Sequence, residues 1–225
     1  MMKEAAFILT MIILIIACDK NSDAHPGQPL IDIDGNKYDT VKINTQFWMQ
    51  QNLKTSYYRN GDLIPEVTSE SSWALLISGA WCWYDNDSAK YAAVYGKLYN
   101  WYAVTDPRGL APSGWHIPSD AEWTALATSL GGDDVAGGSL KETGTSHWGS
   151  PNNDATDITG FKGLPGGYHI DQGMCEYVGY FGDWWSSTEA STFTSFSREL
   201  GYNNTSFIKN ANDKRYGLSV RCLRD

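Results

Sequence analysis

The side chains that could do chemistry are scattered along this chain and form no recognisable catalytic motif. No two histidines have the short spacing typical of metal ligands; the four are His25, His116, His147 and His169. The sequence contains no G-x-S-x-G, no phosphate-binding glycine loop and no H-E-x-x-H. Carboxylates are plentiful, but nothing marks two of them as a glycosidase pair. We therefore expect no enzymatic activity, no catalytic residue and no cofactor.

Two clusters of oxygen-bearing side chains support a calcium hypothesis. Segments 85–87 (Asp-Asn-Asp) and 152–154 (Asn-Asn-Asp) supply hard oxygen ligands on expected loops. The same residue types are common in turns, because their side chains bond to the nearby backbone. Calcium therefore stays an open alternative, and no metal ligand is assigned.

The segment from 184 to 215 carries the sharpest binding hypothesis. It mixes Tyr, Asn, Ser and Arg, which binding loops favour because these residues combine large rigid contacts with adaptable hydrogen bonds. Asn is also what turns between strands require, so a purely structural role stays open. The expected ligand face consists of Tyr202, Asn203, Asn204, Ser206, Phe207, Asn210, Asn212 and Arg215.

Two helices are expected to position these segments. Apolar residues at helical spacing predict the first over residues 90–104. The second begins at Ser119, which forms a capping box with Glu122, and ends at Gly131. His116 lies just before this capping box, where we expect it to pack or to make a buried hydrogen bond.

Short strands are expected on either side of these helices. A hairpin is predicted over 31–38, and a strand pair over 41–53 with a turn near Asn44. By alternation, at least one of Trp184 and Trp185 should point into the core. Early helices and late antiparallel strands predict an α+β fold. The late strands are placed at 161–164, 175–180, 184–188, 193–200, 206–208 and 217–223.

The first 29 residues have the pattern of an export signal and a tether. Residues 5–17 form an apolar run that is shorter than the roughly 20 residues needed to span a bilayer. Residues 15–18 (Ile-Ile-Ala-Cys) resemble the bacterial lipobox, in which Cys18 becomes the lipidated N-terminus. An uncleaved anchor and an ordinary thiol are the alternatives. The polar segment 18–29 is typical of a flexible tether, and the length of residues 30–225 indicates one domain.

Composition narrows the class of partner. The formal net charge is −9, so we expect no nucleic-acid partner, because an acidic domain repels phosphate backbones. Aromatic residues make up 13% of the chain and include 10 Trp, which favours contacts with sugars or proteins. With Cys18 lipidated, at most one internal disulfide can form among Cys82, Cys175 and Cys222, and the sequence does not say which pair forms it.

Four phrases in this order resemble one known family. They are YGKLYNW at 95–101, GWHIPS at 114–119 followed by Glu122 and Trp123, WWSST at 184–188, and YGLSVRC at 216–222. The chain is similar over residues 30–225 to the Fibrobacter succinogenes major paralogous domain, found in exported proteins of Bacteroidetes. Relatives often carry Cys-Pro-x-Gly-Trp-His where this chain begins with Ala111. That departure implies that Cys222 lacks the partner that relatives would offer it.

The resemblance implies a C-type lectin-like fold similar to that of formylglycine-generating enzymes. Those enzymes hold copper with two closely spaced cysteines, and related sulfoxide synthases hold iron with a histidine cluster; neither pattern occurs here. Sugar-binding C-type lectins use Glu-Pro-Asn or Gln-Pro-Asp, and neither triplet occurs here. Some proteins of this fold are diversified by retroelements at Asn-rich positions before the last strand, and segment 202–212 looks similar.

These observations predict a lipoprotein anchored to the bacterial outer membrane and exposed at the cell surface. Its domain is expected to bind a glycan or a protein in an adhesion-type role. The alternatives are a structural component of a cell-surface or fimbrial assembly, and a diverged enzyme of the formylglycine-generating type.

Overall fold

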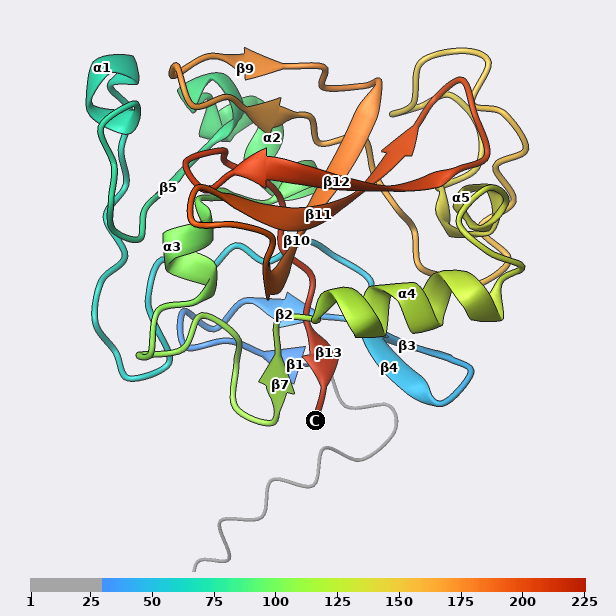
Figure 1. Ribbon diagram of the computed structural model, residues 1–225, viewed down its shortest axis with the longest axis horizontal. Helices are drawn as coiled ribbons and strands as arrows, with labels where there is room; N and C mark the ends of the chain where they lie inside the picture. The colour runs from blue at the N-terminus through green and yellow to red at the C-terminus, as the bar shows by residue number, and fades with distance from the viewer. Residues whose placement is uncertain (1–29) are drawn as a thin grey trace, which may run out of the picture.

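The computed structural model describes residues 30–225. The expected export signal at 1–17, Cys18 and the tether at 18–29 lie outside the described residues. Two antiparallel hairpins begin the described chain, as the sequence predicted, and Asn44 adopts a φ of 52° at the second turn. In the hairpins, β1 (Leu30–Ile31) pairs with β2 (Lys37–Tyr38), and β3 (Thr40–Ile43) pairs with β4 (Gln46–Met49) (Figure 1).

A four-stranded sheet joins distant parts of the chain. Its strand order is β3-β4-β13-β7, with β7 at Trp115–His116 and β13 at Leu223–Arg224. Leu223 pairs with both Trp48 and His116, so the last strand lies between the early hairpin and the middle of the chain. Figure 1 shows β13 beside the C-terminus at the bottom of the view.

The single helix expected over residues 90–104 is wrong. In its place are α2 (Ser88–Tyr95), strand β6 (Leu98–Tyr99) and α3 (Trp101–Val104), and β6 pairs with β5 (Trp81–Cys82). Gly96 follows α2 with a φ of 72°, and a Cβ there would lie 2.9 Å from the carbonyl oxygen of Leu53. The close approach of a distant segment therefore stops the helix.

The second expected helix is confirmed as α4 (Asp120–Ser129). The hydroxyl of Ser119 accepts the backbone N–H of Glu122, and the Glu122 carboxylate accepts the backbone N–H of Ser119. This capping box fixes where the helix starts. The helix stops just before Gly131, whose φ of 101° few other residues would tolerate.

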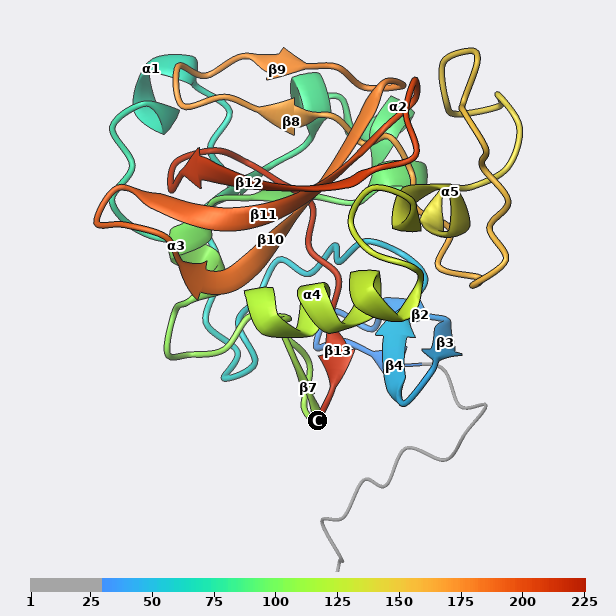
Figure 2. The same ribbon diagram turned by 45° about the vertical axis from the view of Figure 1, so that its right-hand side comes forward.

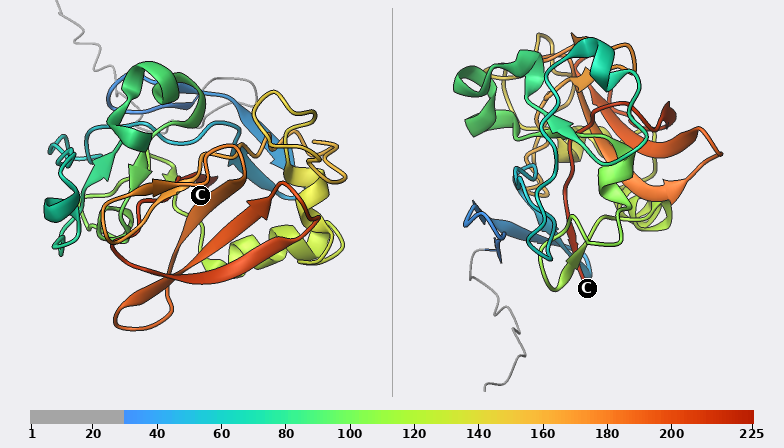
Figure 3. Two further views of the ribbon diagram at one scale, coloured as in Figure 1. Left: turned by 90° about the horizontal axis from the view of Figure 1, so that it is seen from above. Right: turned by 90° about the vertical axis from the view of Figure 1, so that its left-hand side faces the viewer.

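The longest strands form a separate antiparallel sheet, and α4 packs against two of them. Figure 2 shows α4 beneath this sheet, and the right-hand view of Figure 3 shows the sheet on the opposite side of the molecule from β1 and β2. The strand expected at 184–188 lies within one strand of this sheet, and the strands expected at 193–200 and 206–208 overlap its other two. Its strands are β10 (Phe181–Glu189), β11 (Thr194–Gly201) and β12 (Phe207–Asp213), in the order β10-β11-β12.

The other late strands are shorter than expected or absent. No strand forms at 161–164, and the strand expected at 175–180 is limited to β9 (Cys175–Glu176), which pairs with β8 (Tyr168–His169). Lys162 and Tyr177 have φ of 54° and 63°, values that an extended strand does not allow. The strand expected at 217–223 is reduced to isolated bridges before β13.

Three short helical segments complete the described elements: α1 (Glu70–Trp73), a 3₁₀ turn at Tyr84–Asn86, and α5 (Ala136–Leu140). The chain is therefore a mixed helix and strand structure with few helices and mostly short antiparallel strands, in agreement with the expected α+β class. Within residues 30–225, no helix has both the length and the apolar character needed to cross a membrane.

Large tryptophans fill the core and bond to the backbone of other segments. Trp184 and Trp185 are both buried, because the two faces of β10 are both covered; the prediction that at least one points inward is confirmed. Trp184 donates to the Asn52 side chain at 2.8 Å, and Trp185 donates to the carbonyl oxygen of Tyr99 at 2.8 Å. Trp101 donates to the carbonyl oxygen of Ser186 at 2.9 Å. Motifs far apart in the sequence thus meet in the core.

Buried cations hold the loops in place. Burial lowers the pKa of Lys141 to about 8, and its ammonium donates to three carbonyl oxygens of the neighbouring loops. Burial likewise lowers the pKa of Arg221 to about 9, and this guanidinium donates to Asn52 Oδ1 at 2.9 Å. Lys97 lies with its Nζ 3.3 Å from the Trp81 ring centroid. Lys97 and Arg221 belong to the family-like motifs, and both act here as fold determinants.

Candidate functional site

The ligand residues expected from the sequence are spread along β12 and the turns at its two ends. Residues 202–206 make the turn between β11 and β12, whereas Arg215 follows the far end of β12. Seven residues in β12 separate the two ends by more than about 20 Å at the rise of a strand. Asn210 and Asn212 lie between them, within the strand.

Phe207 is a correction to the expected ligand face. Its side chain is 0% exposed, and its ring packs 5.6 Å from the Trp123 ring, centroid to centroid. Alternation along β12 turns Phe207 towards α4 and turns Ile208 away from it. Phe207 therefore belongs to the core and cannot contact a ligand at the surface.

The turn at 202–206 is docked onto neighbouring loops. The Tyr202 ring packs edge-on against Tyr180 at 5.1 Å between centroids. The carbonyl oxygen of Asn203 accepts the Asn153 amide at 2.8 Å, and that of Asn204 accepts the Lys141 ammonium at 2.7 Å. The side chain of Asn204 accepts the backbone N–H of Ser206 at 2.9 Å. These contacts stabilise the turn.

Asn210, Asn212 and Arg215 also use their polar groups internally. The Asn210 amide donates to Glu199 at 3.1 Å, and the Asn212 amide donates to Ser197 at 3.0 Å. The Arg215 guanidinium is held by Asp213 at 2.8 Å and by Asp171 at 3.1 Å.

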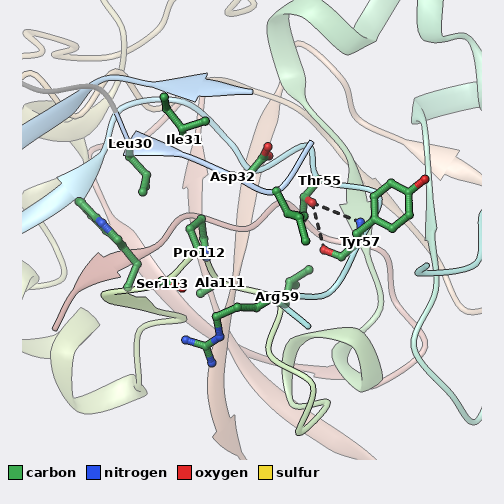
Figure 4. Close-up of a pocket in the computed structure, with 12 residues that line it drawn as sticks. Leu30, Ile31, Asp32, Thr55, Tyr57, Arg59, Ala111, Pro112 and Ser113 are labelled. Carbon is green, nitrogen blue, oxygen red and sulfur yellow. Dashed lines mark hydrogen bonds between the residues drawn. The ribbon is translucent and has the colours of Figure 1, made fainter. Parts of the chain in front are cut away.

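One hollow lies elsewhere, where three segments far apart in the sequence meet. It has a volume of about 450 Å³ and opens at the first described residue, Leu30. Figure 4 shows Leu30 and Ile31 on one side, Arg59 on the other, and Ala111 and Pro112 between them. Its lining is Leu30, Ile31, Asp32, Ile33, Thr55, Tyr57, Arg59, Leu110, Ala111, Pro112, Ser113 and Trp115.

A second hollow of about 350 Å³ shares part of this lining. The shared residues are Arg59, Leu110, Ala111 and Trp115, so the two hollows adjoin with Arg59 between them. The second hollow also reaches His116 and Glu122 at the start of α4. We call the two together the Arg59 groove.

Arg59 stands at the tip of a tight turn. Tyr57 bridges to Leu63, and Gly61 adopts a φ of 95° between them. The backbone N–H of Arg59 donates to the carbonyl oxygen of Gly109 at 2.7 Å, which ties the tip to the facing loop. The Arg59 guanidinium has no hydrogen-bond or ion-pair partner among residues 30–225, whereas those of Arg108, Arg198, Arg215 and Arg221 all have one.

His116 closes one end of the groove as part of a charged tie. Its Nδ1 lies 2.7 Å from Asp225 Oδ1, and its Nε2 lies 2.9 Å from Glu122 Oε1. Partial burial lowers the pKa of His116, but the hydrogen bonds to Asp225 and Glu122 outweigh burial and raise it above its ordinary value. The imidazole thus joins the end of the chain to the first turn of α4, a structural role that agrees with the expectation.

Other groups with catalytic potential are buried or already bonded. Cys82 and Cys222 are buried free thiols, and Cys175 is a half-buried one. Burial raises the pKa of Cys175 to about 11 and raises that of the other two thiols as well. His169 is buried, which lowers its pKa to about 4, and its Nδ1 lies 3.0 Å from the carbonyl oxygen of Ile170.

The two segments considered for calcium form turns. Asp85, Asn86, Asn152 and Asp154 all have φ between 48° and 54°, and Asp87 caps α2 by accepting the backbone N–H of Lys90. Across residues 30–225 there is no group of three or more His, Cys, Asp or Glu side chains able to hold a metal ion.

Sequence reasoning missed the Arg59 groove. Nothing in the local pattern around residue 59 separates Arg59 from an ordinary solvent-exposed arginine. The one usable signal was the hairpin at 31–38, where Ile31 and Ile33 alternate with aspartates and so place two isoleucines on one side.

The fold and the groove define a mixed helix and strand domain with an open groove around Arg59. The family model described as the Fibrobacter succinogenes major domain matches residues 41–224, and the chain belongs to this family. Comparisons with curated proteins and with solved structures gave no match.

Proposed function

We propose that the chain is an exported, lipid-anchored surface protein whose domain recognises a glycan or a protein in the Arg59 groove without catalysing a reaction. The observation that carries this proposal is an unpaired guanidinium that lines two adjoining hollows, whose walls combine aliphatic and polar side chains. Binding sites commonly combine an apolar lining with a few polar groups that fix orientation.

The state of the potential nucleophiles supports recognition rather than catalysis. A thiol attacks as the thiolate, and burial raises the pKa of all three described cysteines above the ordinary value. His116 lies between two carboxylates, so its ring nitrogens are both occupied. Cys222 packs in a different core cluster from Cys82 and Cys175, which argues against a copper pair that includes Cys222.

Export and anchoring are proposed from the first 18 residues, and a C-type lectin-like fold from the family resemblance. If Cys18 carries the lipid, the wild-type chain partitions into the detergent phase after cell fractionation, and the Cys18→Ala variant does not. Equal partitioning of both would contradict lipidation at Cys18.

A groove-filling variant tests recognition. The full chain in mild detergent is screened against glycan and protein arrays, with and without calcium. Ser113→Trp adds bulk to the groove from an exposed position, and Ser146→Trp adds the same bulk at an exposed position outside it. We expect hits that Ser113→Trp removes and Ser146→Trp keeps. Binding that is unchanged in Ser113→Trp contradicts a ligand site in the groove. The absence of binding on both arrays contradicts a recognition function.

A second candidate function, a packing component of a surface assembly, is favoured by one apolar patch. Leu75, Ile77 and Phe193 are 81%, 85% and 75% exposed and line one hollow with Tyr102 and Arg215. Clustered exposed apolar residues mark interaction sites. If the domain packs through this patch, Leu75→Ser together with Ile77→Ser dissociates high-mass complexes extracted from cells, whereas Ser113→Trp leaves them intact.

A further inference from the structure

The exposed apolar side chains of the first hollow in the Arg59 groove are mainly aliphatic. Ile31 and Ile33 project from one side of the β1–β2 hairpin and are 51% and 52% exposed. Of the two aromatic residues in the first hollow, Trp115 is buried, which leaves only Tyr57 with an exposed ring. Sugars are usually bound against exposed aromatic faces, whereas branched aliphatic walls suit the apolar side chains of a polypeptide. The lining therefore favours a peptide over a glycan.

Arg59 supplies a fixed positive group in the middle of these walls. Its turn is tied to the Gly109 carbonyl oxygen, and its guanidinium lies against the Gly109 backbone, where a Cβ would come within 2.5 Å of Nη2. Arg108 on the facing loop is neutralised by Asp106 at 2.8 Å and by Asp62 at 3.3 Å. An unpaired arginine fork matches a carboxylate bidentately.

The carboxylates nearest the groove are already bonded and leave Arg59 available. Asp32 accepts the Tyr38 hydroxyl at 2.6 Å and the Asn36 amide at 2.9 Å. Glu122 is bonded to His116 and to its own helix cap. A carboxylate on an incoming ligand thus has no competitor among the described residues for this guanidinium.

The two hollows continue on both sides of Arg59, so a chain can cross the groove with a side chain placed on the arginine. A chain that ended in a carboxylate at Arg59 would leave one hollow empty. We propose that the Arg59 groove binds an extended peptide segment in which an Asp or Glu side chain pairs with Arg59 and flanking aliphatic side chains pack against Ile31 and Ile33. This inference rests on the proposed function and specifies its ligand.

The test selects peptides from a random display library on the full chain in mild detergent, with a glycan array that includes uronic acids as a parallel arm. We expect selected peptides with an acidic residue between Leu, Ile or Val. We expect Arg59→Gln to weaken the best peptide at least tenfold, about 1.4 kcal/mol. Arg59→Lys should retain part of the affinity, because it keeps the charge and loses the fork. Lys37→Gln, the same charge change at an exposed site outside the groove lining, should have no effect.

The outcomes separate the two proposals. If Ser113→Trp abolishes peptide binding and Arg59→Gln does not, the groove is the binding site and the proposed carboxylate contact is wrong. If Arg59-dependent binding is found only with uronic acids, the domain is still a recognition domain, but the proposal of a peptide ligand is wrong. If both variants bind the selected peptides as tightly as the wild type, the groove is not the ligand site and both proposals are wrong. Thermal melting of each variant checks that the fold is intact, which is expected because Arg59 and Ser113 are exposed.

Discussion

The guanidinium of Arg59 lies against the backbone of Gly109, while the backbone N–H of Arg59 donates to the Gly109 carbonyl oxygen at 2.7 Å. Gly109 has a φ of 81°, so it both permits the turn of its own loop and leaves room for the arginine. The orientation of the proposed ligand-binding side chain therefore depends on the absence of a Cβ at a residue 50 positions further along the chain.

Gly109→Ala should weaken the selected acidic peptide several-fold, because the new Cβ would lie 2.5 Å from Arg59 Nη2 and must displace the guanidinium. The measurement is the dissociation constant by fluorescence anisotropy. Gly114→Ala is a matched control: its φ of 77° imposes the same backbone strain, of about 1 kcal/mol, but a Cβ there meets nothing within 4 Å. Equal affinities for the two variants would contradict this dependence on Gly109.

Phe207→Ala should destabilise the domain by about 3–5 kcal/mol, the usual cost of removing a large aromatic from a core. Its ring is fully buried against Trp123. Urea unfolding followed by tryptophan fluorescence measures the change. The control is Ile208→Ala, a half-buried residue on the opposite face of β12, which should cost less. If Phe207→Ala lowers the free energy of unfolding no more than Ile208→Ala does, Phe207 is not a core residue.

Local signals in the sequence predicted local structure well. Ser119 and Glu122 lie three residues apart, and the capping box they form needs no distant partner, so the start of α4 was predictable. The hairpin at 31–38 and the turn near Asn44 were predictable for the same reason. The four family-like motifs predicted the family, which the match over residues 41–224 confirms.

Features set by distant contacts were not predictable in the same way. The helix expected at 90–104 breaks at Gly96 because residues 52–53 approach its backbone. The sequence predicted Phe207 as a binding residue, but α4 covers the face of β12 on which Phe207 lies. The groove around Arg59 is formed with segments 30–33 and 109–115. No local pattern around residue 59 predicts that these segments lie beside it.

Asp183→Asn should stabilise the domain at pH 7 by at least about 1 kcal/mol. Asp183 is 1% exposed, its Oδ2 has no hydrogen-bond partner, and it lies opposite Glu199 across β10 and β11. Burial, and then the Glu199 charge, raise the pKa of Asp183 well above its ordinary value. A raised carboxyl pKa lowers stability as the pH rises above the unfolded-state pKa of about 3.9, so the gain should shrink towards pH 4.

Denaturant unfolding of wild type and Asp183→Asn between pH 4 and 8 measures this effect. Asp134→Asn removes an exposed carboxylate and should change stability little at any pH in this range. A less stable Asp183→Asn at pH 7 would show that the ionised carboxylate is stabilised in the folded protein, contrary to this prediction.

His116→Gln should destabilise the domain more at pH 5.5 than at pH 9. Hydrogen bonds from the imidazole to Asp225 and Glu122 raise the pKa of His116 despite partial burial. A raised histidine pKa contributes stability that is complete below the unfolded-state pKa of about 6.5 and is lost as the pH rises through the folded-state pKa. The difference in melting temperature between wild type and variant should therefore be largest at pH 5.5. Ser119→Ala removes the cap of the same helix and keeps His116, and should cost about 1 kcal/mol at both pH values. If His116→Gln costs the same at pH 5.5 and pH 9, the tie between β13 and α4 depends on the shape of the ring and not on its charge.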